Sequence, residues 1–319
     1  MTQSQFQFII CRAKFVLPLR ANNLNERITD GYLLSEGEHI REVGRFSRDV
    51  ENRMRTTYGT RMGVLCAQGI EPLETLKDIP CHNAVLMPAF VKAHGHDHEQ
   101  PLIGIAKDEP LTSWLDHAVN PFTGFMNKQH DELCRVLGDS PQKITYRMAR
   151  LCDIHYGITT SMVHHCNHNK YHVREIAEVN ETAGTTMIVA VGGQDRFYVK
   201  ELLDDPRDAV ARMDQALQIT GLQHTTFCPG PDQVFSNSRK MIVPLKNWAR
   251  EHGTLFHIHS AEEPKTTAWF KEAIEPGMTE VEFLEAIGVL DSETVLAHQV
   301  NCFGRDVEIL ARHQTRIVH

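Results

Sequence analysis

From about residue 84 onward, short apolar runs alternate with segments of helical period, and this alternation limits the possible folds more than any other feature of the sequence. The helical pattern over 238–252 stops at Gly253, and Thr279 with Glu282 forms a capping box that opens another helix. Repeated β-α units of this kind predict a parallel sheet covered by helices. The seven runs with strand character are 84–93, 157–163, 185–191, 224–228, 254–259, 294–298 and 315–319.

Two α/β architectures fit this pattern, a doubly wound open sheet and a (β/α)8 barrel. The glycine-rich loops that cradle phosphates in nucleotide-binding folds, G-x-G-x-x-G and G-x-x-x-x-G-K-[ST], are absent from the sequence. Metal-capable side chains at the carboxyl ends of several parallel strands are typical of a barrel active site. Histidines end or follow four of the runs: His94, His96, His164, His165, His259 and His298. We therefore expect a TIM-like barrel, which is incomplete here because only about seven strands are predicted.

The region before the barrel has a different character. Residues 6–17 are rich in Phe, Ile and Val, and 31–44 contain two strand-like runs around Glu36-Gly37, which indicates a hairpin. We expect a β-rich segment over 1–83 and a barrel that lacks its last strand over 84–319. Residues 47–80 show no clear periodicity and receive no assignment.

Composition narrows the classes of partner. The chain has 33 Lys and Arg against 41 Asp and Glu, a formal net charge of −8, which argues against a nucleic-acid or anionic-membrane binder. The longest apolar run, 84–91, is too short to span a bilayer, and the first residues lack a secretory signal. Eight cysteines without a C-x-x-C pair are typical of reduced thiols. We expect a cytoplasmic protein.

The 19 histidines are the strongest chemical signal. His94 and His96 form an H-x-H at a strand end, where residues i and i+2 point the same way and could reach one ion; the alternative is a pair of loop histidines. His259 would add a third neutral imidazole and leave a position for water, with His257 in the strand interior. Glu262, three residues later, could shuttle protons or could be a carboxylate favoured at a helix N-terminus.

Two further histidines, His298 and His164, follow strand-like runs. His298 ends the run TVLAH and could orient or deprotonate an attacking water, or it could be a satisfied core histidine. His164, next to His165, is a candidate substrate contact.

A family resemblance joins these features. The segment LMPAFVKAHGH over 86–96 resembles the opening motif of the amidohydrolase superfamily. The later matches resemble its deaminase and chlorohydrolase branch, which includes guanine deaminase, S-adenosylhomocysteine deaminase and atrazine chlorohydrolase. They follow in the same order along the chain, at 101–104, 111–115, 157–160, 257–263, 281–284, 288–290, 296–298 and 309–319.

The resemblance implies a distorted (β/α)8 barrel with a small β-sandwich. It also implies one divalent metal, Zn or Fe, held by His94, His96 and His259. Glu262 would protonate a ring nitrogen of the substrate, and His298 would hold the metal-activated hydroxide.

The resemblance also implies substrate contacts and an assembly. Glu99 stands where relatives contact substrate, and Trp114 lies in the stretch that resembles L-x-x-W-L. A homodimer is suggested.

Three positions depart from the family pattern. The metal-binding Asp at the end of strand eight is expected beyond His319, so we expect a chain truncated at its C-terminus. Pro88-Ala89 replaces Pro-Gly, and 228–231 read Cys-Pro-Gly-Pro where many deaminases have a histidine. No lysine lies near that strand end, which agrees with a mononuclear site.

These features lead to one hypothesis and two alternatives. We expect a metal-dependent hydrolase that deaminates an amino-substituted heterocycle. The alternatives are hydrolysis of another C–N bond or a C–Cl bond at the same site, or a non-catalytic truncated homologue. Pocket loops decide between such reactions, so the fold cannot separate them.

Overall fold

A computed structural model describes residues 5–165, 172–197, 200 and 203–319. The chain divides into two compact units, Met1–Ala89 and Phe90–His319, which are described separately. Within the described ranges, no helix combines the length and the apolar character needed to cross a bilayer.

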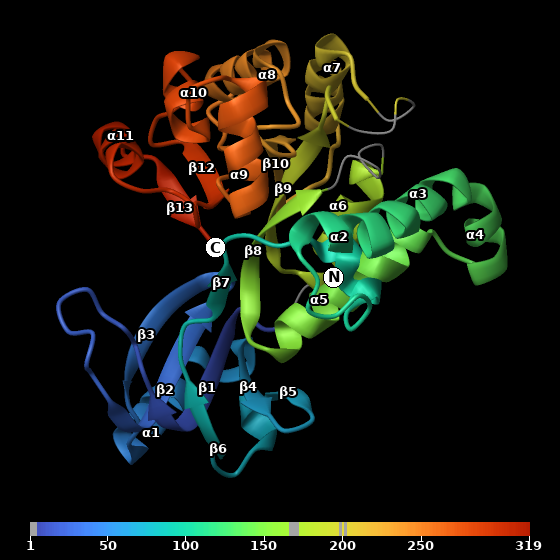
Figure 1. Cartoon of the computed structure of the whole chain (residues 1–319). Helices are drawn as coiled ribbons and strands as arrows, with labels where there is room; N and C mark the ends of the chain where they lie inside the picture. Colours follow the sequence, from blue (N-terminus) through green and yellow to red (C-terminus); the bar gives the residue numbers. More distant parts are fainter. Residues whose placement is uncertain (1–4, 166–171, 198–199, 201–202) are drawn as a thin grey trace. The chain divides into compact units, whose positions relative to one another are not determined.

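The first unit is a six-stranded mixed sheet with one helix (Figure 1). Its strand order is β3-β2-β1-β4-β5, and β6 also pairs with β1. The hairpin expected around Glu36-Gly37 is present as the antiparallel pair β2–β3. The elements are β1 (Phe8–Val16), β2 (Ile28–Glu36), β3 (His39–Arg45), α1 (Arg48–Tyr58), η1 (Gly59–Arg61), β4 (Met62–Cys66), β5 (Gly69–Pro72), η2 (Leu73–Thr75) and β6 (Cys81–Leu86).

The stretch without a sequence assignment, 47–80, contains regular structure. Ser47 caps α1 by accepting a hydrogen bond from the Val50 amide, and Met54 on that helix is fully buried. Met62 and Val64 of β4 enter the same hydrophobic core, which also includes Ile10 of β1. The apolar positions here are too widely spaced to reveal a period, which is why the sequence pattern missed them.

The second unit contains parallel strands arranged in chain order. Four form the sheet β10-β9-β8-β7, and three form β11-β12-β13. A parallel bridge between Gln233 and His259 links the two sheets just beyond β10. Neighbours that follow the chain are typical of a barrel, whereas a doubly wound sheet reverses its order. The strands are β7 (Phe90–Lys92), β8 (Ile158–His165), β9 (Thr186–Gly193), β10 (Thr225–Pro231), β11 (Phe256–Ser260), β12 (Thr294–His298) and β13 (Arg316–Val318).

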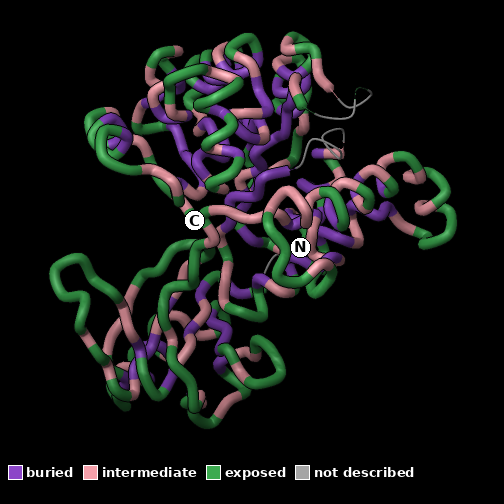
Figure 2. The backbone as a smooth tube through the Cα atoms, in the orientation of Figure 1, coloured by how far each residue is buried: buried purple, intermediate pink, exposed green. Residues whose placement is uncertain are grey.

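Helices connect these strands and pack against them (Figures 1 and 2). A helical excursion separates β7 from β8, and single helices or helix pairs follow the later strands. The helices are η3 (Asp97–Leu102), α2 (Leu111–Trp114), η4 (Leu115–Val119), α3 (Asn120–Lys128), α4 (His130–Leu137), α5 (Pro141–His155), α6 (Val173–Ala183), α7 (Pro206–Leu217), α8 (Arg239–Glu251), α9 (Pro264–Trp269), η7 (Phe270–Ile274), α10 (Glu280–Ala286) and α11 (Arg305–His313).

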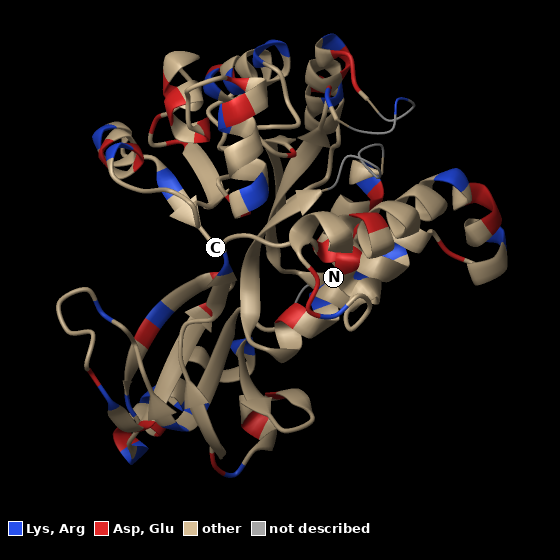
Figure 3. Cartoon of the chain, viewed as in Figure 1, with Lys and Arg blue, Asp and Glu red and all other residues tan. Residues whose placement is uncertain are grey.

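Successive residues of the parallel strands face two different cores, as the two-residue period of a strand requires. Val163, Val189, Phe227 and Leu296 pack in the large core with the helices. Their chain neighbours form a small separate cluster on the other face, Met162, Ala190, Cys228 and Val295. Strands β8 to β12 contain no Lys, Arg, Asp or Glu and are uniformly tan in Figure 3. The second face is therefore the interior of the barrel.

The sequence located most of these elements. The capping box at Thr279 and Glu282 is confirmed at the start of α10, and six of the seven predicted runs correspond to β8–β13 within a few residues. The run over 84–93 was wrongly assigned to one strand. The structure ends β6 at Leu86 and begins β7 at Phe90, because Pro88 has no N–H to donate to a sheet.

A buried group of charges fixes the chain where β7 ends. Lys92 Nζ lies 2.7 Å from Asp97 Oδ1 and 2.8 Å from Asp153 Oδ2. Arg150, with 2% of its side chain exposed, pairs with both carboxylates and donates to Ser161 Oγ at 2.6 Å. Together they tie the loop after β7 to α5 and β8.

Arg150→Met should strongly destabilise the fold, because it leaves two buried carboxylates to share Lys92. We expect the free energy of unfolding in urea to fall by about 3–5 kcal/mol. Arg147→Met on the same helix breaks an ion pair with Asp139 whose side chains are 54% and 37% exposed, and it should cost less than about 1 kcal/mol. Equal losses for the two variants would contradict a structural role for the buried group.

Candidate functional site

The H-x-H motif follows β7 directly. Gly95, between the two histidines, accepts a hydrogen bond through its carbonyl from the His164 amide at 2.8 Å, which fixes this loop against β8. His94 Nδ1 lies 3.0 Å from His257 Nε2 on β11, and His94 Nε2 is buried with no hydrogen-bond partner among the described residues. Burial lowers the pKa of His94 to about 4, so its imidazole is neutral near pH 7.

The third predicted imidazole, His259, meets this loop from β11. Its Nδ1 lies 2.6 Å from the Asp232 carbonyl oxygen, which can only accept, so Nδ1 carries the proton and Nε2 keeps its lone pair. That Nε2 lies 3.1 Å from His96 Nε2. Burial lowers the pKa of both His96 and His259. The neighbouring His259 lowers that of His96 further, and His94 lowers that of His259 further.

This donor set fits a divalent transition metal. His94, His259 and His298 each present a nitrogen within 4.8 Å of the other two, and so do His96, His164 and His259. Neutral imidazoles are the form that binds zinc or iron, and about 3.3 Å separates neighbouring nitrogens in a tetrahedral zinc site with bonds of about 2.0–2.1 Å. The 3.1 Å between His96 and His259 is close to that spacing.

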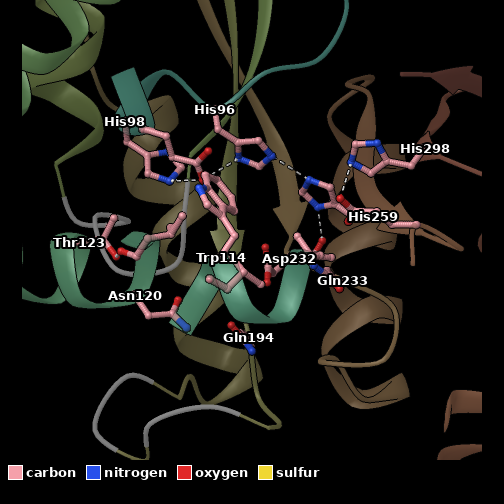
Figure 4. A pocket seen from close by; sticks show the side chains of 15 residues that line it. His96, His98, Trp114, Asn120, Thr123, Gln194, Asp232, Gln233, His259 and His298 are labelled. Carbon is pink, nitrogen blue, oxygen red and sulfur yellow. Dashed lines mark hydrogen bonds and ion pairs between the residues drawn. The ribbon is translucent and has the colours of Figure 1, made fainter. Parts of the chain in front are cut away.

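Glu262 and His298 face each other across the ends of β11 and β12. Glu262 Oε1 lies 3.4 Å from His298 Nε2 (Figure 4). Burial, followed by the nearby Asp232 carboxylate, raises the pKa of Glu262 to about 7. Burial lowers the pKa of His298 to about 4. A carboxyl that holds its proton near neutrality beside a neutral imidazole is suited to proton transfer.

The backbone around this pair is held in an unusual conformation. Ala261 has φ +49° and His298 has φ +81°, in the left-handed region that non-glycine residues rarely adopt. The Ala261 amide donates to Glu280 Oε2 at 2.5 Å, and the Asn301 side chain donates to the Glu262 carbonyl at 3.1 Å. These bonds sustain the turn that presents Glu262 to the site.

A pocket of about 160 Å³ opens beside the histidines (Figure 4). Two predicted substrate residues line it: Trp114 faces into the pocket, and Glu99 Oε1 lies 3.9 Å from His96 Nδ1. His164 does not line the pocket; it is fully buried behind His96 and His259. The lining residues are His96, His98, Glu99, Leu111, Trp114, Leu115, Val119, Asn120, Thr123, Gln194, Asp232, Gln233, His259, Glu262 and His298.

The sequence analysis missed several residues at this site. Asp232 and Gln233 follow the end of β10, and Gln194 follows the end of β9. Their position at the carboxyl ends of parallel strands was the available signal. His257 was expected only as strand interior, yet its imidazole contacts His94.

Glu280→Gln should raise stability at alkaline pH. Burial raises the folded-state pKa of Glu280 from 4.5 to about 7, so its ionised form destabilises the folded chain. This destabilisation is absent below pH 4.5 and fully present above about pH 7. Gln keeps an acceptor for the Ala261 amide without ionising. The variant should match the parent chain at pH 4 and exceed it by about 1–3 kcal/mol at pH 8, measured by urea unfolding.

A second glutamate of α10 provides the control. Arg312 and His313 lower the pKa of Glu285, so Glu285→Gln should lose stability relative to the parent as pH rises. If the difference in free energy of unfolding between Glu280→Gln and the parent does not change with pH, the account of Glu280 as a buried ionisable group is wrong.

The chain is similar to known proteins in sequence and in structure. The model of the Amidohydrolase family matches residues 85–319. A 5-methylthioadenosine/S-adenosylhomocysteine deaminase from Thermococcus sibiricus is 26% identical over 241 residues, which are 76% of this chain and 52% of that protein. A 5'-deoxyadenosine deaminase from Methanobrevibacter smithii is 22% identical over 243 residues, which are again 76% of this chain and 52% of that protein. The chain thus spans about half the length of these relatives.

Solved structures share the fold. Guanine deaminase from C. acetobutylicum superposes with a TM-score of 0.78 at 17% identity, covering 98% of this chain and 67% of that one. The zinc complex of atrazine chlorohydrolase from Arthrobacter aurescens superposes with a TM-score of 0.72 at 17% identity, covering 98% of this chain and 65% of that one. This likeness confirms the distorted TIM-type barrel over the doubly wound alternative. Because the family model covers more than half of its residues, the chain belongs to the amidohydrolase family.

Proposed function

We propose that this chain hydrolyses an amino-substituted heterocycle, replacing an exocyclic amino group by a carbonyl and releasing ammonia. The observation that carries the proposal is the convergence of neutral imidazoles with Glu262, a carboxyl of pKa about 7, on one pocket. The family is metal-dependent, and its relatives include deaminases of adenosine derivatives.

We assign His94, His96 and His259 as the protein ligands of one divalent metal, Zn or Fe. A metal bound there lowers the pKa of a water molecule and so supplies a nucleophile at neutral pH. The buried Nε2 of His94 supports this assignment, because without an ion it has no partner among the described residues. His259 Nε2 also supports it, because this atom keeps its lone pair and lies 3.1 Å from His96 Nε2.

Glu262 and His298 would move the protons. Glu262, protonated near neutral pH, would donate to a ring nitrogen and make the adjacent carbon more electrophilic. Neutral His298, 3.4 Å away, would accept a hydrogen bond from the attacking water and orient it. His298 would take one proton from the water as it attacks, and this proton would pass to the departing amino group, so that ammonia leaves as the C–N bond breaks. The remaining hydroxyl proton would return to the Glu262 carboxylate as the carbonyl forms.

The pocket walls suit an amino-heterocycle. Carboxamides of Asn120, Gln194 and Gln233 and carboxylates of Glu99 and Asp232 offer acceptors for amino and ring N–H groups. The indole of Trp114 supplies a flat apolar surface against which a ring can stack (Figure 4). The described lining residues include no Lys or Arg, so a phosphate would find no counter-charge there.

His259→Ala should bind one metal ion fewer per chain than the parent protein, because His259 shares its site with each of the other proposed ligands. Zinc content after dialysis measures this directly. His155→Ala, which removes an exposed histidine of α5, should keep the parent zinc content. Unchanged zinc in His259→Ala would contradict the ligand assignment.

Glu262→Gln should keep its metal and lose about 10²–10⁴-fold in kcat, because the amide cannot transfer a proton. Ammonia release from a panel of aminopurines, aminopyrimidines and aminotriazines measures the activity of the zinc-loaded chain. Glu251→Gln, an exposed glutamate at the end of α8, should behave as the parent. The deaminase proposal fails if zinc is bound and no compound of the panel yields ammonia; release of chloride from chlorotriazines would then favour the sibling reaction.

A further inference from the structure

Asp232 lines the pocket with a fixed backbone and an unengaged carboxylate (Figure 4). Its amide donates to the Gly193 carbonyl at 3.0 Å, and its carbonyl accepts from the His259 amide at 3.1 Å and from His259 Nδ1 at 2.6 Å. In the part of the chain that the structure describes, its carboxylate makes no hydrogen bond and no ion pair. The main chain of Asp232 therefore serves the fold, and its side chain is placed to meet a ligand.

The charges of the pocket wall favour N–H groups of a ligand over carbonyl groups. Glu99, Asp232 and Glu262 line the pocket, and the described lining residues include no Lys or Arg. Asp232 lies near the reacting side of the pocket, since after burial it is the next cause of the raised pKa of Glu262. A carboxylate oxygen only accepts hydrogen bonds, so a carbonyl turned toward Asp232 would leave both groups unsatisfied. An amino group in the same place would donate to it.

Two uncharged residues of the wall add further acceptors. The Thr123 hydroxyl donates to the Val119 carbonyl at 2.7 Å, so its oxygen can only accept from a ligand. Gln194 Nε2 donates to the Arg196 carbonyl at 3.1 Å, which fixes the amide and leaves Oε1 and one N–H for a ligand. Thr123 and Gln194 are buried, at 1% and 4% exposure. The polar groups that the fold holds in one orientation therefore offer mostly acceptors.

We propose that Asp232 makes the pocket selective for heterocycles that carry a second amino group besides the one that is hydrolysed. The proposal rests on the deaminase function proposed above and narrows its substrate class to diamino- and triamino-heterocycles. An amino group donates to Asp232, whereas an oxo group at the same ring position only accepts. A buried acceptor that loses its water and gains no donor is costly, so the oxo compound is rejected. Asp232 is in this account a specificity-determining residue.

Matched pairs of ligands test this selectivity without turnover. Diaminopurine against guanine, and diaminopyrimidine against cytosine, each exchange one amino group for an oxo group. Isothermal titration calorimetry on the zinc-loaded Glu262→Gln chain measures their binding, because that chain cannot transfer the proton. In every pair that binds, we expect the diamino compound to bind about tenfold more tightly or better. Equal binding, tighter binding of the oxo compound, or binding of neither pair would overturn the proposal.

Variants in the same Glu262→Gln chain assign the selectivity to Asp232. Asp232→Asn should keep its zinc and reduce the ratio of the two affinities to about one, since an amide can turn an N–H toward an oxo group. Asp208→Asn, at an exposed aspartate of α7, should keep the original ratio. An unchanged ratio in Asp232→Asn would contradict the assignment, and the ratio without it decides alone should that variant fold poorly. The preference can fail while ammonia is released and can hold while none is, so the failure of either proposal is distinguishable.

Discussion

The removal of imidazoles from water is the constraint on which the site depends. His94, His96, His257 and His259 are grouped beside strands β8 to β12, which carry no Lys or Arg, and burial lowers the pKa of all four. A protonated imidazole there would pay the cost of desolvation and repel its neighbours, so the rings remain neutral with lone pairs available. The same burial acts in the opposite direction on Glu262, whose charged form it disfavours, and raises its pKa to about 7. One physical cause thus keeps the imidazoles neutral and the Glu262 carboxyl largely protonated near pH 7.

Holding these rings in place requires rigid support at the strand ends. Lys92 and Asp97 flank the H-x-H loop, and their buried ion pairs with Arg150 and Asp153 fix it from the side away from the pocket. On the opposite wall, the Asp232 carbonyl fixes the tautomer of His259. Polar groups that would be costly alone are satisfied by one another, and this makes the arrangement specific. The positive φ angles of Ala261 and His298 persist because surrounding hydrogen bonds over-determine them.

Sequence patterns predicted those helices and strands whose positions depend on residues close together in the chain. The capping box at Thr279 and the strands that end in His259 and His298 follow from periodicity and turn chemistry within a few residues. The break at Pro88 was missed because apolar residues continue on both sides of it. Asp232 and His257 were missed for a different reason: their roles depend on contacts with residues 27 and 163 positions away, which no local pattern encodes.

Zinc K-edge X-ray absorption on the chain loaded with one equivalent of zinc tests the central claim most directly, because the spectrum reports the ligands of the bound ion. We predict three imidazole nitrogens at about 2.0–2.1 Å, from His94, His96 and His259. A spectrum with one imidazole or none would contradict the claim that the buried histidines form a metal centre.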